Sequence, residues 1–226
     1  MGKRWLTDSF FQANTIKGHR YLDDAGKIMN RWDSEFPNKD VGLQGLFMRN
    51  PDAFMRELRV DNRTIWIHFS FADRLRQITE LSINTTTEIC GILEVKQFSR
   101  LGLRIQFIYD VSDVTGESGQ LINRIFVPAL QDIIEGDRTR DNFQFAVNTG
   151  TQQNPVTLRV ATVEKKPEAK SPPGFPEHGL LIDADIFQTQ TSHLDDLKRF
   201  MQSVQNWVDD ELPKIESAVL GGQQHG

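Results

Sequence analysis

Alternating hydrophobic and polar positions predict a strand in the middle of the chain. Over residues 101–110 the apolar side chains fall on one side: Leu101, Leu103, Ile105, Phe107 and Tyr109. Residues 88–96 also have the composition of a strand, and the short segment 97–100 has the length of a tight turn. Residues 88–111 are therefore predicted to form a central antiparallel hairpin whose apolar side faces the core.

The same pattern predicts further strands on both sides of this hairpin. Before it, strands are predicted over 42–49, 54–60 and 63–71, with Asp61-Asn62 as a turn between the last two. Residues 1–18 fit a short strand or an irregular lead-in, and residues 73–89 fit a loop or a strand. After the hairpin, strands are predicted over 142–147, 156–164 and 179–188. These strands favour antiparallel pairing, because only short connections separate most of them.

A period of 3.6 residues predicts three helices. The early helix covers 21–36 and carries Trp32 as a core anchor before Pro37 ends it. A mid-chain helix covers 121–135, with a kink or new start at Pro128. A long C-terminal helix begins at Ser192 as N-cap and runs to Pro213. The predicted fold class is α+β, with an antiparallel sheet or sheets and an early, a mid-chain and a C-terminal helix.

Composition and charge narrow the class of protein. The 226 residues are 38% hydrophobic and 25% charged, which is typical of a globular protein. The net charge is −5, and residues 113–226 carry 10 basic and 17 acidic residues, so a long nucleic-acid surface is disfavoured. The single cysteine, Cys90, excludes a disulfide within the chain and is expected to be buried and inert. The absence of an apolar run long enough for a membrane span, and of a secretion signal, predicts a cytoplasmic protein.

The polar segment 112–119 separates two halves of similar organisation. We expect a single compact unit over residues 1–226, with two α+β halves, 1–112 and 113–226, as the alternative. Both halves place a helix before antiparallel strands, although no repeat is visible at residue level. The loop 165–177 contains four prolines and is interpreted as a solvated hairpin tip; the alternative is an arm that docks Phe175 on a partner.

Two charged motifs on predicted strands are candidates for a functional site. Asp183 and Asp185 lie two residues apart, so their carboxylates share one face about 7 Å apart and could hold a divalent metal. Arg100 and Arg104 lie on the polar side of the central strand and could bind an anion. The preferred interpretation is that Arg100 or Arg104 pairs with Asp183 or Asp185 across neighbouring strands.

Metal-dependent chemistry would need a further ligand close to the two aspartates. His178 and His193 flank the strand at its two ends, too far along it to complete the site by spacing. His68, beside Trp66, is interpreted as a hydrogen-bonded surface histidine. Glycine-rich phosphate loops, nucleophile elbows and zinc-binding helices are absent from the sequence. We therefore assign no catalytic, cofactor-binding or metal residue.

Two segments carry a resemblance to a known family. Arg100-Leu101-Gly102-Leu103-Arg104 and the strand from Gly179 to Phe187 resemble an Arg-x-Gly-Leu-Arg strand and a Gly-x-x-x-Asp-x-Asp strand. Both are found in a sporadically distributed family of bacterial proteins without an established activity. The resemblance extends loosely over residues 21–220. It implies α+β architecture and a bacterial or mobile-element setting, and the family's scattered distribution suits an accessory or antiviral defence role.

These observations lead to two functional hypotheses of different classes. The first is a non-enzymatic protein-interaction or scaffold subunit that works with another protein encoded nearby, with a homo-oligomer as a further option. The alternative is a metal-dependent hydrolase or nuclease centred on Asp183 and Asp185. Neither hypothesis involves a membrane or an organic cofactor. For the first hypothesis, a nucleic-acid partner is not expected.

Overall fold

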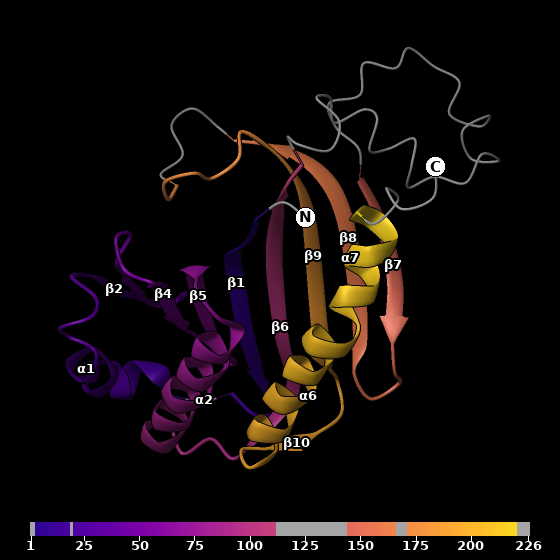
Figure 1. Cartoon of the computed structure of the whole chain (residues 1–226). Helices are drawn as coiled ribbons and strands as arrows, with labels where there is room; N and C mark the ends of the chain where they lie inside the picture. Colours follow the sequence, from indigo (N-terminus) through magenta and orange to yellow (C-terminus); the bar gives the residue numbers. More distant parts are fainter. Residues whose placement is uncertain (1–2, 19, 112–143, 166–170, 221–226) are drawn as a thin grey trace, which may run out of the picture.

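One antiparallel sheet forms the frame of the molecule (Figure 1). The computed structural model describes residues 3–18, 20–111, 144–165 and 171–220. The described strands are β1 (Arg4–Thr15), β2 (Asn38–Gly42), β3 (Gly45–Arg49), β4 (Met55–Val60), β5 (Thr64–Ala72), β6 (Gln97–Asp110), β7 (Gln144–Gly150), β8 (Pro155–Glu164), β9 (His178–Gln188) and β10 (Ser192–His193). Their order across the sheet is β2-β3-β4-β5-β1-β6-β9-β8-β7, and β10 pairs with β6.

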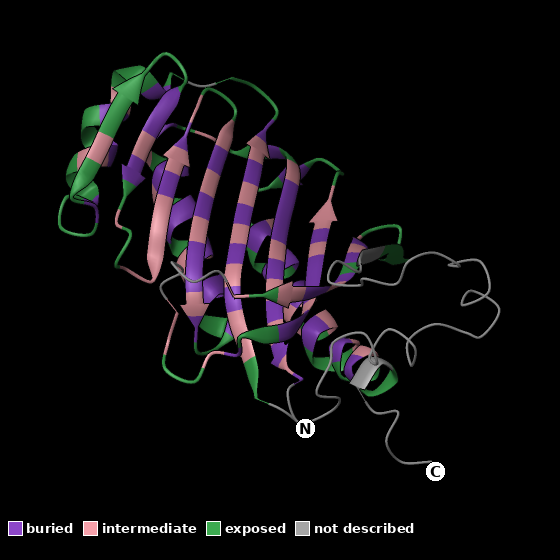
Figure 2. Cartoon of the chain, turned by 90° about the horizontal axis from the view of Figure 1, so that it is seen from above, coloured by how far each residue is buried: buried purple, intermediate pink, exposed green. Residues whose placement is uncertain are grey.

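The helices lie on one face of this sheet (Figures 1 and 2). They are α1 (Tyr21–Arg31), α2 (Leu75–Ile92), α6 (Asp196–Asp210) and α7 (Leu212–Leu220). The α+β fold class is thus confirmed, with an early helix, a mid-chain helix and a long C-terminal pair. The mid-chain helix of the structure is α2, whereas the helix predicted over 121–135 lies outside the described residues. None of the described helices is both long enough and apolar enough to cross a lipid bilayer.

The predicted central hairpin is wrong in its first half. Residues 88–92 form the last turn and a half of α2, and residues 97–100 are the start of β6 rather than a turn. Residues 73–89, predicted as a loop or strand, also belong mainly to this helix. Instead, β6 pairs with β1 on one side and with β9 on the other. The predicted strand 101–110 itself is confirmed and lies next to the middle of the sheet.

Alternation along the strands builds the core between the sheet and the helices. Leu103, Ile105 and Phe107 of β6 are all buried on the helix side. From α6, the buried side chains facing them are Leu197, Phe200, Met201, Val204 and Val208. Complete burial of one such aliphatic or aromatic side chain contributes about 1.5–3 kcal/mol to folding, so the β6–α6 layer is a main source of stability.

Other predicted boundaries shift by a few residues. The early helix ends at Arg31, so Trp32 and Phe36 are buried just beyond it. Leu22, predicted on its apolar face, is 46% exposed. Ser192 lies in β10, and Asp195 is the N-cap of α6. Residues 1–18 contain β1, a full strand that pairs with both β5 and β6.

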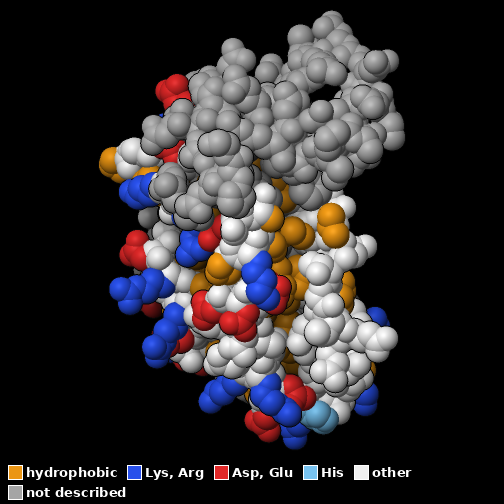
Figure 3. All heavy atoms as spheres, turned by 45° about the vertical axis from the view of Figure 1, so that its right-hand side comes forward, with side chains coloured by type: hydrophobic (Ala, Val, Ile, Leu, Met, Phe, Trp, Pro, Cys, Tyr) orange, Lys and Arg blue, Asp and Glu red, His pale blue; other side chains and the backbone are white. Residues whose placement is uncertain are grey.

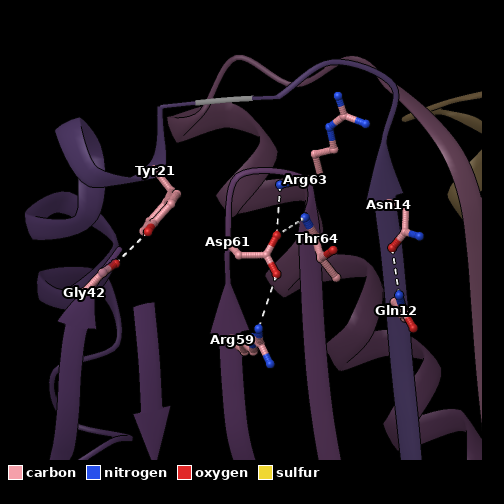
Figure 4. Close-up of polar contacts among 8 residues, drawn as sticks. All are labelled: Gln12, Asn14, Tyr21, Gly42, Arg59, Asp61, Arg63 and Thr64. Atoms are coloured by element: carbon pink, nitrogen blue, oxygen red, sulfur yellow. Dashed lines mark hydrogen bonds and ion pairs between the residues drawn. The ribbon is translucent and has the colours of Figure 1, made fainter. Parts of the chain in front are cut away.

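Local polar contacts fix the turns at the β2–β5 side of the sheet (Figure 4). The Asp61 carboxylate accepts hydrogen bonds from the backbone N–H groups of Arg63 (2.9 Å) and Thr64 (2.8 Å), which closes the β4–β5 turn. The Tyr21 hydroxyl donates to the carbonyl oxygen of Gly42 at 2.6 Å and so ties the start of α1 to β2. The turn predicted from Asp61-Asn62 is confirmed.

The C-terminal helix α7 is attached to the sheet through a buried carboxylate. Glu216 accepts hydrogen bonds from the Tyr109 hydroxyl at 2.5 Å and from Arg4 Nη1 at 2.9 Å. Burial, followed by this hydrogen bond to Glu216, raises the pKa of Tyr109 above its ordinary value. The phenol therefore stays protonated and keeps donating at neutral pH.

The order of elements repeats about the β1–β6 pair. Each run begins with a central strand, continues with outer strands that return to it as a meander, and ends with a helix. The first run is β1 to α2 and the second is β6 to α6. The two runs share one sheet, because β1 and β6 pair antiparallel along most of their length. The sheet therefore includes described strands from both sides of residue 112.

The described end of the proline-rich loop folds back onto the protein. Phe175 packs edge-on against Trp5 and Phe71, with ring centroids 5.7 Å apart in each pair. Phe175 is thus half-buried against the protein, while Pro173 and Gly174 beside it are exposed. Residues 166–170 of the loop lie outside the described part of the chain.

Candidate functional site

The sheet face opposite the helices, which we call the open face, carries the candidate site. No helix in the described ranges lies on it. Figure 2 shows that buried and partly buried residues alternate along its strands. On the helix side of the neighbouring strands β8 and β7, hydrophobic side chains also reach the surface (Figure 3), and Val147 is 47% exposed there. That second area is apolar, whereas the open face combines aromatic rings with charges.

The register of four strands brings the charged and aromatic residues together. Gln12 of β1 lies between Trp66 of β5 and Gly102 of β6. One pair further along, Phe10 lies between His68 and Arg104. Asp183 and Asp185 of β9 face β6 on its other side. Each of these positions alternates with a buried residue on the helix side, which is why the pattern in the sequence places them all on the open face.

Arg104 and Asp183 form a two-pronged ion pair. Arg104 Nε donates to Asp183 Oδ1 at 2.8 Å and Nη2 donates to Oδ2 at 2.5 Å. The Asp183 side chain is 4% exposed, so this arginine is what compensates the carboxylate. The hydrogen bond to Asp183 is also the largest cause of the raised pKa of Arg104. The predicted cross-strand pairing is confirmed, diagonally rather than directly across, since Arg104 is opposite Asp185 in register.

Arg100 is held more loosely than Arg104. Its Nη2 lies 3.5 Å from Asp185 Oδ2, and its Nη1 donates to Gln12 Oε1 at 3.3 Å. Both distances exceed the 2.7–2.9 Å that is typical of a charge-assisted hydrogen bond. The guanidinium carbon lies 5.2 Å from the centre of the Phe187 ring. Gln12 is in turn fixed by donating to Asn14 Oδ1 at 2.8 Å (Figure 4).

A hollow of about 360 Å³ opens between these side chains. It is lined by Phe10, Gln12, Trp66, Arg100, Gly102, Arg104 and Asp185. Gly102 forms its floor, and a Cβ placed there would lie 3.5 Å from the guanidinium carbon of Arg100. A Cβ there would make an ordinary van der Waals contact with the guanidinium, whereas a longer side chain would compete with Arg100 for the hollow.

Aromatic rings form the wall of the hollow on the β1–β5 side. The Phe10 ring is stacked on Trp66, with centroids 5.7 Å apart, and on His68, with centroids 4.6 Å apart. His68 Nε2 lies 2.7 Å from Asp8 Oδ1. The histidine is a hydrogen-bonded residue of the open face, as predicted, and it supports the ring stack.

The other candidates for chemistry lie apart from this hollow. His178 pairs with Glu164 at the far end of β9, and the backbone N–H of His193 donates to Asp196. Among the described residues no three His, Cys, Asp or Glu side chains are grouped as a metal site. Cys90 is buried in α2, and this burial raises the pKa of its thiol to about 12, which keeps it protonated.

Comparison of the sequence with protein-family models and with curated proteins gives no match. The sequence predicted the arginines and the aspartates as candidates, but it did not predict Phe10, Gln12 or Trp66 as residues of the site. Alternation along residues 4–15 was the available signal, and it was obscured because Phe10 and Phe11 point to opposite faces.

Proposed function

We propose that the protein is a non-enzymatic interaction subunit that binds another protein through the open face. The observation that supports this most is the grouping of Phe10, Trp66, Arg100 and Arg104 around the hollow. Aromatic residues and arginine are enriched at the centres of protein interfaces and in their hot spots, because aromatic rings provide large, rigid contact areas and the guanidinium provides several hydrogen-bond donors. A partner seated there would cover rings that are now partly exposed.

The ion pairs of the open face favour this proposal over the hydrolase alternative. A catalytic metal needs carboxylate oxygens that are free to coordinate it. Both oxygens of Asp183 accept hydrogen bonds from Arg104, and Asp185 lies beside Arg100. A metal at this position would have to displace one guanidinium and approach the other.

The biological setting follows from the family resemblance. A scattered distribution among bacteria supports an accessory role, such as a component of an antiviral defence system, with the partner encoded nearby. A second copy of this chain is the other protein that could occupy the open face.

Co-expression with the products of neighbouring genes tests the proposal. We expect one of these proteins, or a second copy of this chain, to form a complex detected by size-exclusion chromatography with light scattering. Trp66→Ala should weaken the complex at least tenfold, because an interface ring at a hot spot contributes about 2 kcal/mol or more.

Leu22→Ala is the matched control, since Leu22 is an exposed apolar residue of α1. It should leave the complex unchanged, and circular dichroism should show both variants folded. A complex that is equally stable with Trp66→Ala, or a chain that remains monomeric with every neighbouring gene product, would refute the proposal.

A further inference from the structure

The hollow over Gly102 has a shape suited to one small group. Its volume of about 360 Å³ is at the lower end of the range for ligand sites, which is enough for one side chain and its neighbour but small for a large cofactor. The aromatic wall at Trp66 and Phe10 suits an apolar part of the incoming group. The opposite wall, at Arg100 and Asp185, is polar.

Arg100 is the more loosely held of the two arginines that line this hollow. Its two polar contacts, at 3.3 and 3.5 Å, are long, and its side chain is 29% exposed. Arg104, by contrast, is committed to Asp183 through two short bonds. A planar guanidinium is the best protein group for recognising a carboxylate, because two parallel N–H donors match its two oxygens.

The charges around the hollow favour a monoanion over a phosphate. Arg100, Arg104 and Arg159, which lies opposite Asp183 on β8, outnumber Asp183 and Asp185 by one positive charge before anything binds. A carboxylate adds one negative charge beside a loosely held guanidinium. A phosphate dianion adds two, and it would do so next to the Asp185 carboxylate that lines the same hollow.

From these observations we infer that the hollow binds an aspartate or glutamate side chain of the partner protein, with Arg100 as its donor and the Trp66–Phe10 rings against an adjoining apolar residue. This inference rests on the proposed function, and it adds the chemistry of the group that the partner presents. Gly102 leaves the hollow open, because a long side chain at this position would occupy the space beside the Arg100 guanidinium.

A peptide titration of the full chain tests the inference. The probe is an acetylated and amidated Phe-Glu-Phe tripeptide, and the same peptide with Gln in place of Glu is its control. Binding is followed by NMR at the Trp66 indole N–H and the Arg100 Nε–H. We expect saturable shifts with the Glu peptide at concentrations up to about 10 mM, and at least fivefold weaker binding of the Gln peptide.

Three variants distinguish the two parallel N–H donors of Arg100 from its positive charge and from effects elsewhere on the open face. Arg100→Lys keeps the charge but loses the paired N–H donors, and should weaken binding of the Glu peptide at least threefold. Gly102→Leu fills the hollow and should abolish binding in a protein that remains folded by circular dichroism. Arg49→Gln removes an open-face arginine that pairs with Glu57, away from the hollow, and should bind like the unaltered protein.

The outcomes distinguish this inference from the proposed function. Absence of saturable shifts, equal binding of the Gln peptide, or tighter binding of adenosine monophosphate than of the Glu peptide would overturn the carboxylate assignment. If a partner complex still formed and still depended on Trp66, the proposed function would stand without it. If the Glu peptide bound as expected but no partner complex formed, the proposed function would fail and the site would remain.

Discussion

At the scale of single residues, burial determines what a side chain can do. Cys90 carries a nucleophilic atom, but its side chain lies inside α2's packed face and its thiol is protonated. Residues such as Trp32 and Phe107 could be placed in the core from their neighbours in sequence alone. Leu22 could not, because the buried face of α1 carries Tyr21, Ala25 and Ile28 and leaves Leu22 46% exposed beside it.

The pKa of Cys90 predicts how stability changes at alkaline pH. Its ordinary value of 9.0 rises to about 12 in the folded protein, so above pH 9 the unfolded chain releases this proton first. The stabilising contribution is thus complete below pH 9 and is lost as pH rises towards 12. We expect urea unfolding to show a loss of about 1 kcal/mol between pH 8 and pH 10, reduced in Cys90→Ala.

Thiol labelling provides the independent check on Cys90. A thiol reagent at pH 8 should react at a rate limited by opening of the fold, and denaturant should accelerate it strongly. Immediate labelling of the folded protein would show that the thiol is accessible, and stability that increases from pH 8 to pH 10 would contradict the raised pKa.

At the scale of elements, α2 shows why one helix was missed. Its buried face contains Ser82, Thr85 and Thr86 where a typical amphipathic helix has aliphatic residues. A pattern that counts only hydrophobic positions therefore loses the helical period, and the threonines have low helix propensity. The contacts of α2 with α1, β5 and α6 favour the helix in this segment. These contacts involve residues far away in the sequence, so the local pattern does not show them.

The pairing of β6 with β9 predicts the effect of removing the two aspartates. Replacing Asp183 and Asp185 together by asparagine should cost about 1–2 kcal/mol of unfolding free energy, because Arg104 loses a short two-pronged bond but is 39% exposed to water. Calorimetry should detect no micromolar binding of Mn²⁺ or Mg²⁺ before or after the change.

Arg49→Gln again serves as the comparison, since its pair with Glu57 is longer, at 3.5 Å, and more exposed. It should change stability by less than about 0.5 kcal/mol. Micromolar metal binding to the unaltered protein, lost in the double variant, would support the hydrolase alternative instead.

At the scale of the whole molecule, one sheet joins the two runs of elements. The ten described strands include β1 at the N-terminal side and β9 near the C-terminal side, joined through β6. The order of strands and the identity of the open face depend on pairings between distant residues, such as Arg4 with Tyr109 and Leu101 with Gln188. Alternation predicts each strand and its two faces, but it cannot say which strands are neighbours or which face the helices cover.

The continuous sheet predicts a single cooperative unfolding transition. Breaking the β1–β6 pair would expose the apolar side of both strands, so the two runs should not unfold separately. Hydrogen exchange followed by mass spectrometry should give similar opening free energies for β5, β6 and β9. Two transitions, with β8 and β9 exchanging well before β1 and β5, would instead indicate two independent halves.

The central position of β1 has a consequence for synthesis on the ribosome. The strand is made early, and β5 can pair with one of its edges as soon as it emerges. Its other edge must wait until β6 has been translated, roughly 90 residues later, and β6 in turn waits for β9. Until then the nascent chain presents an open strand edge beside apolar residues. Chaperones shield surfaces of this kind, and stalled or truncated chains aggregate through them.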